Sequence, residues 1–428
     1  MNYKFLLSFL NLILFYINAS AQPAPAPVQK EIICIQGGTI HVGNGTLIPN
    51  GIIIFEKNKI IYVGIDSNQC KGVKTKINAS GKHIYPGFIC PATNLGLAEI
   101  EQVKATLDDR EIGSLNANVR SLTAYNTDSK IIPTVRSNGM LLAQIIPQGG
   151  IISGQSSILQ LDAWNWEDAV IKADDGVFLN WPGLSFRNYT SDTEKQQTQD
   201  RYQLELNSIK NYFDEAFAYA NQSQHFEKNL GFEALRLLWT SKKKLYIRAH
   251  QAKAIIQAVQ FAKNYGITPI LVGASDSWRI TDFLKQNQIP IILTDLHSLP
   301  LREDDDIDQP YKNPKILQDQ GILFCLSMNG FWQQRNLVFQ AGHALGYGLE
   351  YEQAVASISL NAAKIMGIEE QTGSIEIGKD ATLFISDGDA LDIRSNHVTR
   401  AFIQGRDIDL DNKQKELYRR FWSKYHPN

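Results

Sequence analysis

Apolar and polar positions follow two different rhythms along this chain. Between residues 32 and 86, short apolar segments are separated by turns rich in Gly and Asn, a pattern typical of β-strands joined by tight turns. The same pattern returns near the other end of the chain, at 381–386 and 397–403. We therefore expect strands from the two ends to share one sheet. The expected strands of the first region are 32–36, 39–42, 51–56, 59–63 and 82–85.

In the middle of the chain, short apolar segments alternate with segments whose apolar residues recur at helical spacing. A strand at 244–247 precedes a helix at 251–265, which ends at Gly266. Strands and helices follow one another at similar spacing as far as a helix that begins at Trp332. This alternation predicts a parallel α/β sheet with right-handed crossovers, and further units before residue 244 would close it into a (β/α)8 TIM-like barrel. The polar segment 190–229 is expected to be a helical insertion on the outside.

The first 21 residues have the features of a signal peptide. Lys4 precedes an apolar segment at 5–16, and small residues at 19–21 (ASA) offer a peptidase site. The apolar segment is shorter than the roughly 20 residues that span a bilayer, so no transmembrane anchor is expected in the mature chain. We expect an exported protein, periplasmic or secreted, whose mature chain starts near Gln22 with an extended leader to residue 31.

Charge and cysteine content narrow the possibilities further. The chain has 42 Lys and Arg against 44 Asp and Glu, a net charge of −2, so it lacks the basic excess typical of nucleic-acid binding. Export permits disulfides, and four cysteines allow three full pairings. Cys34 and Cys70 flank strands of one small region and could pair. Cys90 and Cys325 end apolar segments. Buried free thiols are the favoured interpretation for all four cysteines.

Three segments carry a resemblance to a known family. Residues 85–89 (YPGFI), 361–367 (NAAKIMG) and 372–381 (TGSIEIGKDA) resemble motifs of the amidohydrolase superfamily, and the best match is its imidazolonepropionase-like, exported branch. The resemblance implies a barrel over 87–370, a β-sandwich domain from 32–86 plus 371–410, and a C-terminal helix in 411–428. It also implies hydrolysis of non-peptide C–N bonds by water activated on a divalent metal such as zinc.

The expected metal ligands are mostly replaced. The family pattern places a His-x-His pair where this chain has Ala92 and Asn94, and a His where it has Arg248. A further His is expected near Ser275, and Asn329 stands at the place of the catalytic Asp. Alanine has no donor atom, an amide is a weak ligand for zinc, and a guanidinium repels a cation. We therefore expect a degenerate site and no metal cofactor.

Other residues are candidates for remaining chemistry or binding. The candidate catalytic residues are His250, Asn329, Asp295 and His297, the last two as an Asp-x-His pair that would orient an imidazole.

Trp164 and Trp166 are expected to ring the barrel mouth with Arg248 and to bind substrate. The glycine-rich stretch 148–157 is expected to be a loop on the substrate side. His343 is expected to be structural. Residues 414–425 place apolar side chains at helical spacing, for docking on the chain's own domain or on a second subunit.

Three functions remain open at this level. The leading hypothesis is a family member with impaired or absent catalysis, a pseudoenzyme that pairs with an intact homologue or with itself. The second is an active hydrolase of cyclic amides or dipeptide-like compounds with an atypical site. The third is a protein that binds an anionic or aromatic small molecule in the barrel mouth, because Arg248 inverts the charge that the pocket prefers.

Overall fold

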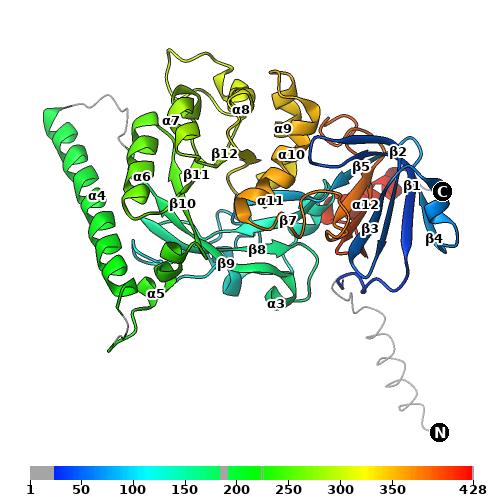
Figure 1. Cartoon of the computed structure of the whole chain (residues 1–428), viewed down its shortest axis with the longest axis horizontal. Helices are drawn as coiled ribbons and strands as arrows, with labels where there is room; N and C mark the ends of the chain where they lie inside the picture. Colours follow the sequence, from blue (N-terminus) through cyan, green and yellow to red (C-terminus); the bar gives the residue numbers. More distant parts are fainter. Residues whose placement is uncertain (1–23, 184–190, 223, 225, 427–428) are drawn as a thin grey trace, which may run out of the picture.

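The computed structural model describes residues 24–183, 191–222, 224 and 226–426, and the predicted signal peptide lies outside these ranges. The described chain forms two eight-stranded sheets (Figure 1). The largest buried hydrophobic cluster contains residues of both sheets. Among the described residues, no helix is both long and apolar enough to cross a membrane.

The first sheet combines strands from both ends of the chain, as predicted. Its order is β16-β15-β14-β5-β1-β2-β3, with β4 beside β1. The predicted strands 32–36 and 39–42 form one strand, β1, with a register shift after Gln36 where Gly37 has φ +86°. The strands are β1 (Ile33–His41), β2 (Leu47–Glu56), β3 (Lys59–Gly64), β4 (Thr75–Asn78), β5 (His83–Pro86), β14 (Leu383–Ser386), β15 (Val398–Ile403) and β16 (Arg406–Ile408).

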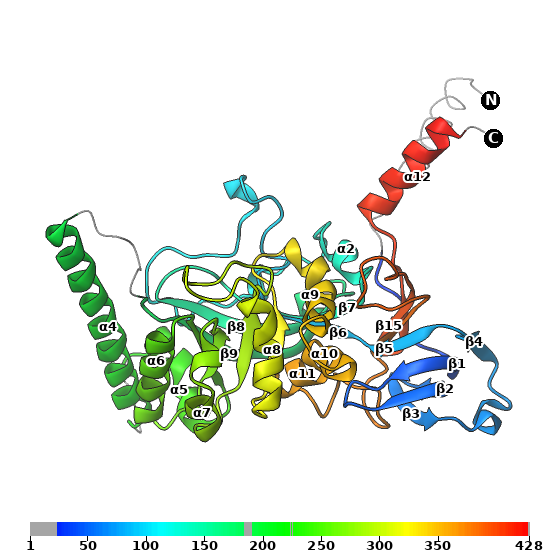
Figure 2. The same ribbon diagram turned by 90° about the horizontal axis from the view of Figure 1, so that it is seen from above.

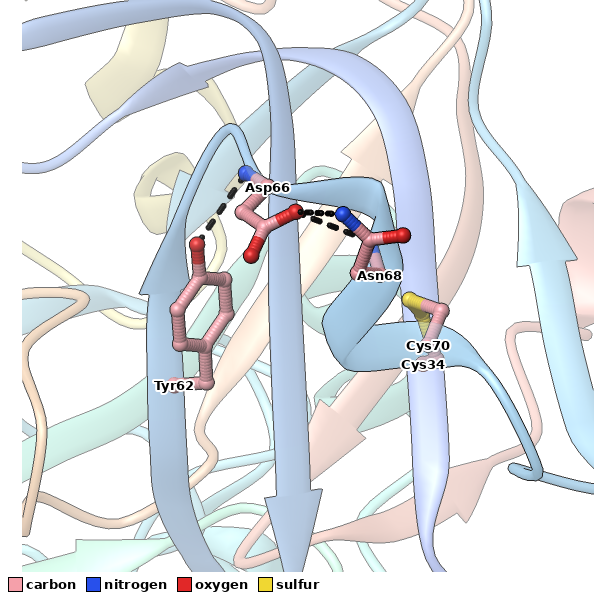
Figure 3. The surroundings of a disulfide bond; sticks show 5 residues. All are labelled: Cys34, Tyr62, Asp66, Asn68 and Cys70. Atoms are coloured by element: carbon pink, nitrogen blue, oxygen red, sulfur yellow. Dashed lines mark hydrogen bonds between the residues drawn. A yellow bond between two sulfur atoms is a disulfide. The ribbon is translucent and has the colours of Figure 1, made fainter.

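A disulfide ties this sheet to the turn that follows β3. Cys34 on β1 is bonded to Cys70 at the end of the short 3-10 helix η1 (Ser67–Cys70), with 6.0 Å between the Cα atoms (Figure 3). Asp66 caps η1 by accepting a hydrogen bond from the Asn68 backbone N–H at 3.0 Å. The expectation of free thiols is therefore wrong for this pair. It is confirmed for Cys90 and Cys325, which are buried and unbonded.

The second sheet is a nearly closed barrel of the expected fold class, with one strand reversed. Its order runs from β6 to β13, and β13 returns beside β6, where the Ser327 hydroxyl donates to the Pro91 carbonyl at 2.5 Å. The strands are β6 (Phe88–Thr93), β7 (Met140–Ile145), β8 (Ile152–Gln160), β9 (Val170–Asn180), β10 (Lys244–Ala249), β11 (Ile270–Gly273), β12 (Ile291–Thr294) and β13 (Phe324–Ser327).

The reversed strand is β8, which runs antiparallel to both β7 and β9. The prediction of an all-parallel barrel is therefore wrong at this point. The connection from β7 to β8, residues 146–151, is too short for a crossover helix, so the chain must turn back on itself. Gly149 and Gly150 supply the positive φ values, +81° and +65°, that this turn requires.

Helices surround the barrel, and one of them closes the end at which the parallel strands begin. One buried cluster joins α11 (Leu360–Met366) to a residue of every barrel strand: Ile89, Leu142, Ile158, Phe178, Tyr246, Val272, Ile292 and Cys325. Lys172 and Lys244 donate to the α11 carbonyls of Met366 and Ile365, the first at 2.9 Å. The helix α11 therefore plugs the end where the parallel strands begin, and the opposite end forms the mouth.

The predicted polar insertion is confirmed as the long outer helix α4 (Figure 1). In Figure 2 the C-terminal helix α12 projects away from the rest of the chain. The helices are α2 (Ile132–Arg136), α3 (Trp166–Ala169), α4 (Asp192–Ala220), α5 (Leu230–Arg236), α6 (Ala252–Asn264), α7 (Thr281–Gln286), α8 (Gln309–Asp319), α9 (Leu337–Leu345), α10 (Tyr351–Ser357), α11 (Leu360–Met366) and α12 (Lys413–Tyr425).

Candidate active site at the barrel mouth

The mouth is formed where β6, β7 and β9 to β13 end and where β8 begins. Ala92 lies at the end of β6 with φ +50°, and its backbone N–H donates to the Gln144 side chain at 3.2 Å. Asn94 follows β6 and donates through Nδ2 to the buried carboxylate of Asp109 at 2.8 Å. The first strand of the barrel therefore presents a methyl group and an amide whose Nδ2 is engaged, while its buried Oδ1 has no hydrogen-bond partner in the described structure.

Arg248 lies at the end of β10 and points its guanidinium toward β9 and the glycine-rich turn. Its Nη1 donates to Asn180 Oδ1 at 3.1 Å and to Gln148 Oε1 at 3.4 Å. No carboxylate of the described chain lies within ion-pair distance of it. Burial lowers the pKa of Arg248 and the Asp295 carboxylate opposes this effect, but arginine stays charged in any case. The mouth therefore contains a partly buried cation held by neutral amide oxygens.

His250 follows β10 and lies over Gly273. Its Nδ1 is 3.0 Å from the Ser275 hydroxyl, and a Cβ on Gly273 would lie 2.4 Å from the imidazole Cε1. Burial lowers the pKa of His250, and the neighbouring Arg248 lowers it further. His250 is therefore neutral at pH 7, a form that can accept a proton.

Asp295 and Asn329 meet across the ends of β12 and β13. The Asp295 carboxylate accepts from the Asn329 backbone N–H at 3.0 Å and from the Asn329 side-chain amide. Both Arg248 and His250 feel the charge of this carboxylate. The structure thus brings together four of the predicted residues: Arg248, His250, Asp295 and Asn329.

The predicted pairing of Asp295 with His297 is not formed in the described structure. His297 is exposed, and its ring packs against His343 and Tyr311, with centroid distances of 4.8 and 5.8 Å. His343 also stacks on Tyr311 at 4.7 Å, so it belongs to a surface ring cluster. The carboxylate of Asp295 is occupied by Asn329, which leaves it unavailable to orient His297.

Trp164 and Trp166 lie at the opposite end of the barrel from Arg248. They follow β8, which starts at the mouth beside Leu179 and ends near Val170, where β9 begins. Trp164 is 67 % exposed, and its carbonyl accepts from the Thr127 hydroxyl at 3.1 Å. The expectation that these two tryptophans ring the mouth is therefore wrong, because the reversed strand carries them away from it.

Comparisons with known proteins agree with this barrel. The family model described as "Amidohydrolase family" matches residues 314–411. An 86-residue segment is 29 % identical to the imidazolonepropionase of Thermoplasma volcanium, covering 19 % of this chain and 21 % of that protein. An 80-residue segment is 32 % identical to the amidohydrolase tasK of Hapsidospora irregularis, covering 18 % of this chain and 8 % of that protein.

Among solved structures, the chain is similar to an amidohydrolase from Thermotoga maritima MSB8, with a TM-score of 0.74 and 21 % identity over 88 % of this chain and 99 % of that one. The chain therefore shares the amidohydrolase fold, and residues 314–411 match the amidohydrolase family in sequence. Its sequence matches span about a fifth or less of the curated relatives' length. The comparisons therefore show the fold of this chain and do not show its activity.

The divalent metal of the superfamily does not fit the donors at this mouth. Ala92 offers only a methyl group, and Arg248 offers positive N–H donors where a lone pair is needed. Asn94 and Asn329 donate through Nδ2 to Asp109 and Asp295, and each offers a metal only a neutral amide oxygen, a weak ligand for zinc. Within the described ranges, no three His, Cys, Asp or Glu side chains are grouped so that they could hold a metal ion. We derive no step through a metal.

Two residues of the mouth were not predicted. Asn180 ends β9 and also donates to Ser153 and to the Gly150 carbonyl, at 2.9 and 2.8 Å. Gln148 lies in the stretch 148–157 predicted as a substrate-side loop, but only residues 148–151 form the turn at the mouth, and residues 152–157 belong to strand β8. Asn180 directly follows the apolar run 177–179, and that strand ending was the available signal for it.

A buried carboxylate lies below the mouth, inside the barrel. Asp175 accepts from the Ser156 hydroxyl at 2.5 Å and from the Tyr246 hydroxyl at 2.7 Å. Burial raises the pKa of Asp175, and these two hydrogen bonds oppose the rise. The Gln144 amide links this group to Ala92 through its carbonyl oxygen. The polar network holds β7 to β10 in place under the mouth.

Proposed function

We propose that this chain is a member of the amidohydrolase superfamily that is impaired in, or has lost, metal-dependent hydrolysis of non-peptide C–N bonds and acts as a non-catalytic homologue. The observation that carries the proposal is Arg248, whose guanidinium occupies the mouth and is fixed there by Asn180 and Gln148. A divalent cation about 4 Å from this charge would be repelled by on the order of 8 kcal/mol at an effective dielectric constant of about 20. Ala92 adds no ligand that could offset this repulsion.

The test measures metal content and hydrolysis on protein purified without chelators. We expect less than about a tenth of an equivalent of divalent metal per chain, unchanged after dialysis against zinc, and no turnover of cyclic amides or dipeptides. Close to one equivalent of metal, with turnover abolished by a chelator, would refute the proposal. Turnover that resists chelators and disappears in His250→Ala would instead favour the hydrolase with an atypical site, since a neutral His250 can act as a general base.

We propose as a second candidate that the mouth binds a small anionic molecule. The observation that favours it is the charge of Arg248, which is balanced in the described structure only by amide oxygens and by the more distant Asp295. A carboxylate could accept two parallel hydrogen bonds from a guanidinium, which an amide oxygen cannot match. A ligand of this class would therefore be more stable here than in a neutral pocket.

Thermal shift measurements with small carboxylates test this second candidate. We expect stabilisation that grows with ligand concentration in the wild type and is absent in Arg248→Gln. Arg236→Gln on the half-exposed surface of α5 is the matched control and should respond like the wild type. Equal shifts in all three proteins would show that the carboxylates act elsewhere.

We also propose that the protein is exported, as its first 21 residues predict. The disulfide between Cys34 and Cys70 supports this proposal, because structural disulfides persist in oxidising compartments and are rare in the cytosol. N-terminal sequencing of protein recovered from the cell envelope or the medium should give a start near Gln22. A chain that keeps Met1 and stays in the cytosol would contradict it.

A further inference from the structure

A pocket of about 420 Å³ lies beside the barrel mouth, between the ends of β11 and β12 and the first turn of α8. Leu293 of β12 lines it and belongs to the same buried cluster as Leu317 of α8, whereas the preceding Ile292 belongs to the cluster inside the barrel. The pocket is therefore on the outer side of the barrel wall, and Asp295 lies where it meets the mouth. Small-molecule sites measure about 300–1,000 Å³, so this pocket suits a small ligand.

Gln309, the first residue of α8, lines this pocket with a hydrogen-bond donor that has no acceptor. The residue is only 8 % exposed, and its Nε2 has no hydrogen-bond partner in the described structure. Its backbone N–H is already satisfied by the Asp306 carbonyl at 2.9 Å. A buried amide N–H without an acceptor is unfavourable, and a ligand oxygen placed here would remove that penalty.

Asp295 gives the pocket a carboxylate without a cationic partner. It accepts hydrogen bonds from the backbone and the side-chain amide of Asn329, and both of these donors are neutral. Within the described ranges no Lys, Arg or His lies at ion-pair distance from it, and none lines the pocket. The charge of Asp295 is therefore available to a cation in the pocket.

The two other carboxylates of the lining are neutralised by arginines behind the pocket wall. Asp276 accepts two hydrogen bonds from Arg302, at 2.8 and 2.7 Å. Asp305 pairs with Arg279 and lies 3.6 Å from Arg302. Two acids and two arginines balance one another and fix the loop after β12 against the end of β11. The net charge that the lining presents is therefore that of Asp295.

We propose that this pocket binds a small organic cation, an amine that also carries a hydroxyl or carbonyl oxygen on a compact apolar body. The ammonium pairs with Asp295, and the oxygen accepts a hydrogen bond from Gln309 Nε2. The apolar body covers Leu293, Leu296 and the 77 % exposed Leu299, which all line the pocket. The site is distinct from the anion site proposed at Arg248, because it lies outside the strands and selects the opposite charge.

Calorimetric titration of the full chain with three matched probes tests the proposal. Leucinol has the amine, the hydroxyl and a branched apolar body, isoamylamine lacks the hydroxymethyl group, and isohexanol lacks the amine. We expect one leucinol per chain. Isohexanol should bind at least tenfold more weakly, because the ion pair with Asp295 is lost, and isoamylamine about fivefold more weakly, because Gln309 again has no acceptor.

Variants assign each contact to its residue. Asp295→Asn should weaken leucinol about tenfold and leave isohexanol unchanged, and Gln309→Met should weaken leucinol about fivefold and leave isoamylamine unchanged. Gln318→Met is the matched control, since Gln318 lies on the same helix, its Oε1 is also buried without a partner, and it does not line the pocket. It should bind leucinol like the wild type.

The wild-type probes keep the proposal testable even where a variant fails to fold, which circular dichroism would show. No binding of leucinol up to about 10 mM, a concentration at which even a small ligand with both contacts should bind, would overturn the proposal. Equal affinities of the three probes would also overturn it. So would leucinol binding that Asp295→Asn and Gln309→Met leave unchanged, since leucinol would then bind elsewhere.

Discussion

Removing the disulfide between Cys34 and Cys70 should reduce the stability of the sheet built from both chain ends. The two residues are 36 positions apart in sequence. In the chain-entropy model, a loop of this length stabilises the folded state by about 4 kcal/mol at 25 °C, because the cross-link restricts the unfolded chain. Both sulfurs are buried, so reduction exposes no new surface in the folded state, and the whole effect falls on the unfolding equilibrium.

Urea unfolding with and without dithiothreitol measures this effect. Dithiothreitol should lower the unfolding free energy of the wild type by about 3–4 kcal/mol and should not affect Cys34→Ala/Cys70→Ala. Cys90→Ala/Cys325→Ala is the control, since it removes two buried thiols that are not bonded. It should lose only local packing and should respond to dithiothreitol like the wild type.

Alkylation of the unfolded chain counts the free thiols independently. The wild type should react at two of its four cysteines without reductant and at all four with it. Four reactive thiols without reductant would refute the pairing itself. A confirmed pairing whose reduction changes the unfolding free energy by less than about 1 kcal/mol would refute the entropic argument.

Two further predictions concern the mouth and the floor of the barrel. Gly273→Ala should lower the free energy of unfolding by about 2–3 kcal/mol and raise the pKa of His250 in NMR titrations, because Gly273 has φ +92° and the new Cβ displaces the imidazole from its buried place. Gly266→Ala is the control, since Gly266 has φ +72° and nothing lies within 4 Å of the new Cβ. It should lower the free energy of unfolding by only about 1 kcal/mol and leave the pKa of His250 unchanged. Burial, and then the charge of Lys172, lowers the pKa of Lys244 to about 8 from 10.5. Between pH 8 and 10.5 Lys244 binds more protons in the unfolded chain than in the folded one, so the free energy of unfolding of the wild type should rise with pH by about 3 kcal/mol relative to that of Lys244→Met. Urea unfolding of both proteins at about pH 7.5 and 10 measures this rise, and the same change in both proteins would contradict the prediction.

The sequence predicts most elements of the fold because their signals are local. The helix α6 shows its apolar face and its terminal glycine within 16 residues, 251–266, and the strands that alternate with helices from 244 onward are short apolar segments between turns. The direction of β8 carries no such signal. All nine of its residues are buried, so its pattern is the same for a parallel and an antiparallel neighbour, and only the short connection from β7 hints at the reversal.

The residues of the candidate site were likewise predictable where their sequence signal is local, and not where their position depends on strand direction. The family resemblance predicts that Ala92, Arg248 and Asn329 replace metal ligands, because it indicates which residue follows each strand. The prediction for Trp164 is wrong because nine residues of β8 span about 30 Å at 3.3 Å per residue, and strand direction decides at which end of the barrel the next loop lies.

The sequence by itself therefore determines the two-part architecture, the strands from both ends, and the chemical identity of the residues that end the barrel strands. Only the tertiary structure decides which of these residues meet. Arg248 finds its partners Gln148 and Asn180 at separations of 100 and 68 residues, and Cys34 finds Cys70 rather than another thiol. Periodicity records which face of an element is buried, but contacts between distant elements depend on how the whole chain packs, and no local pattern encodes that packing.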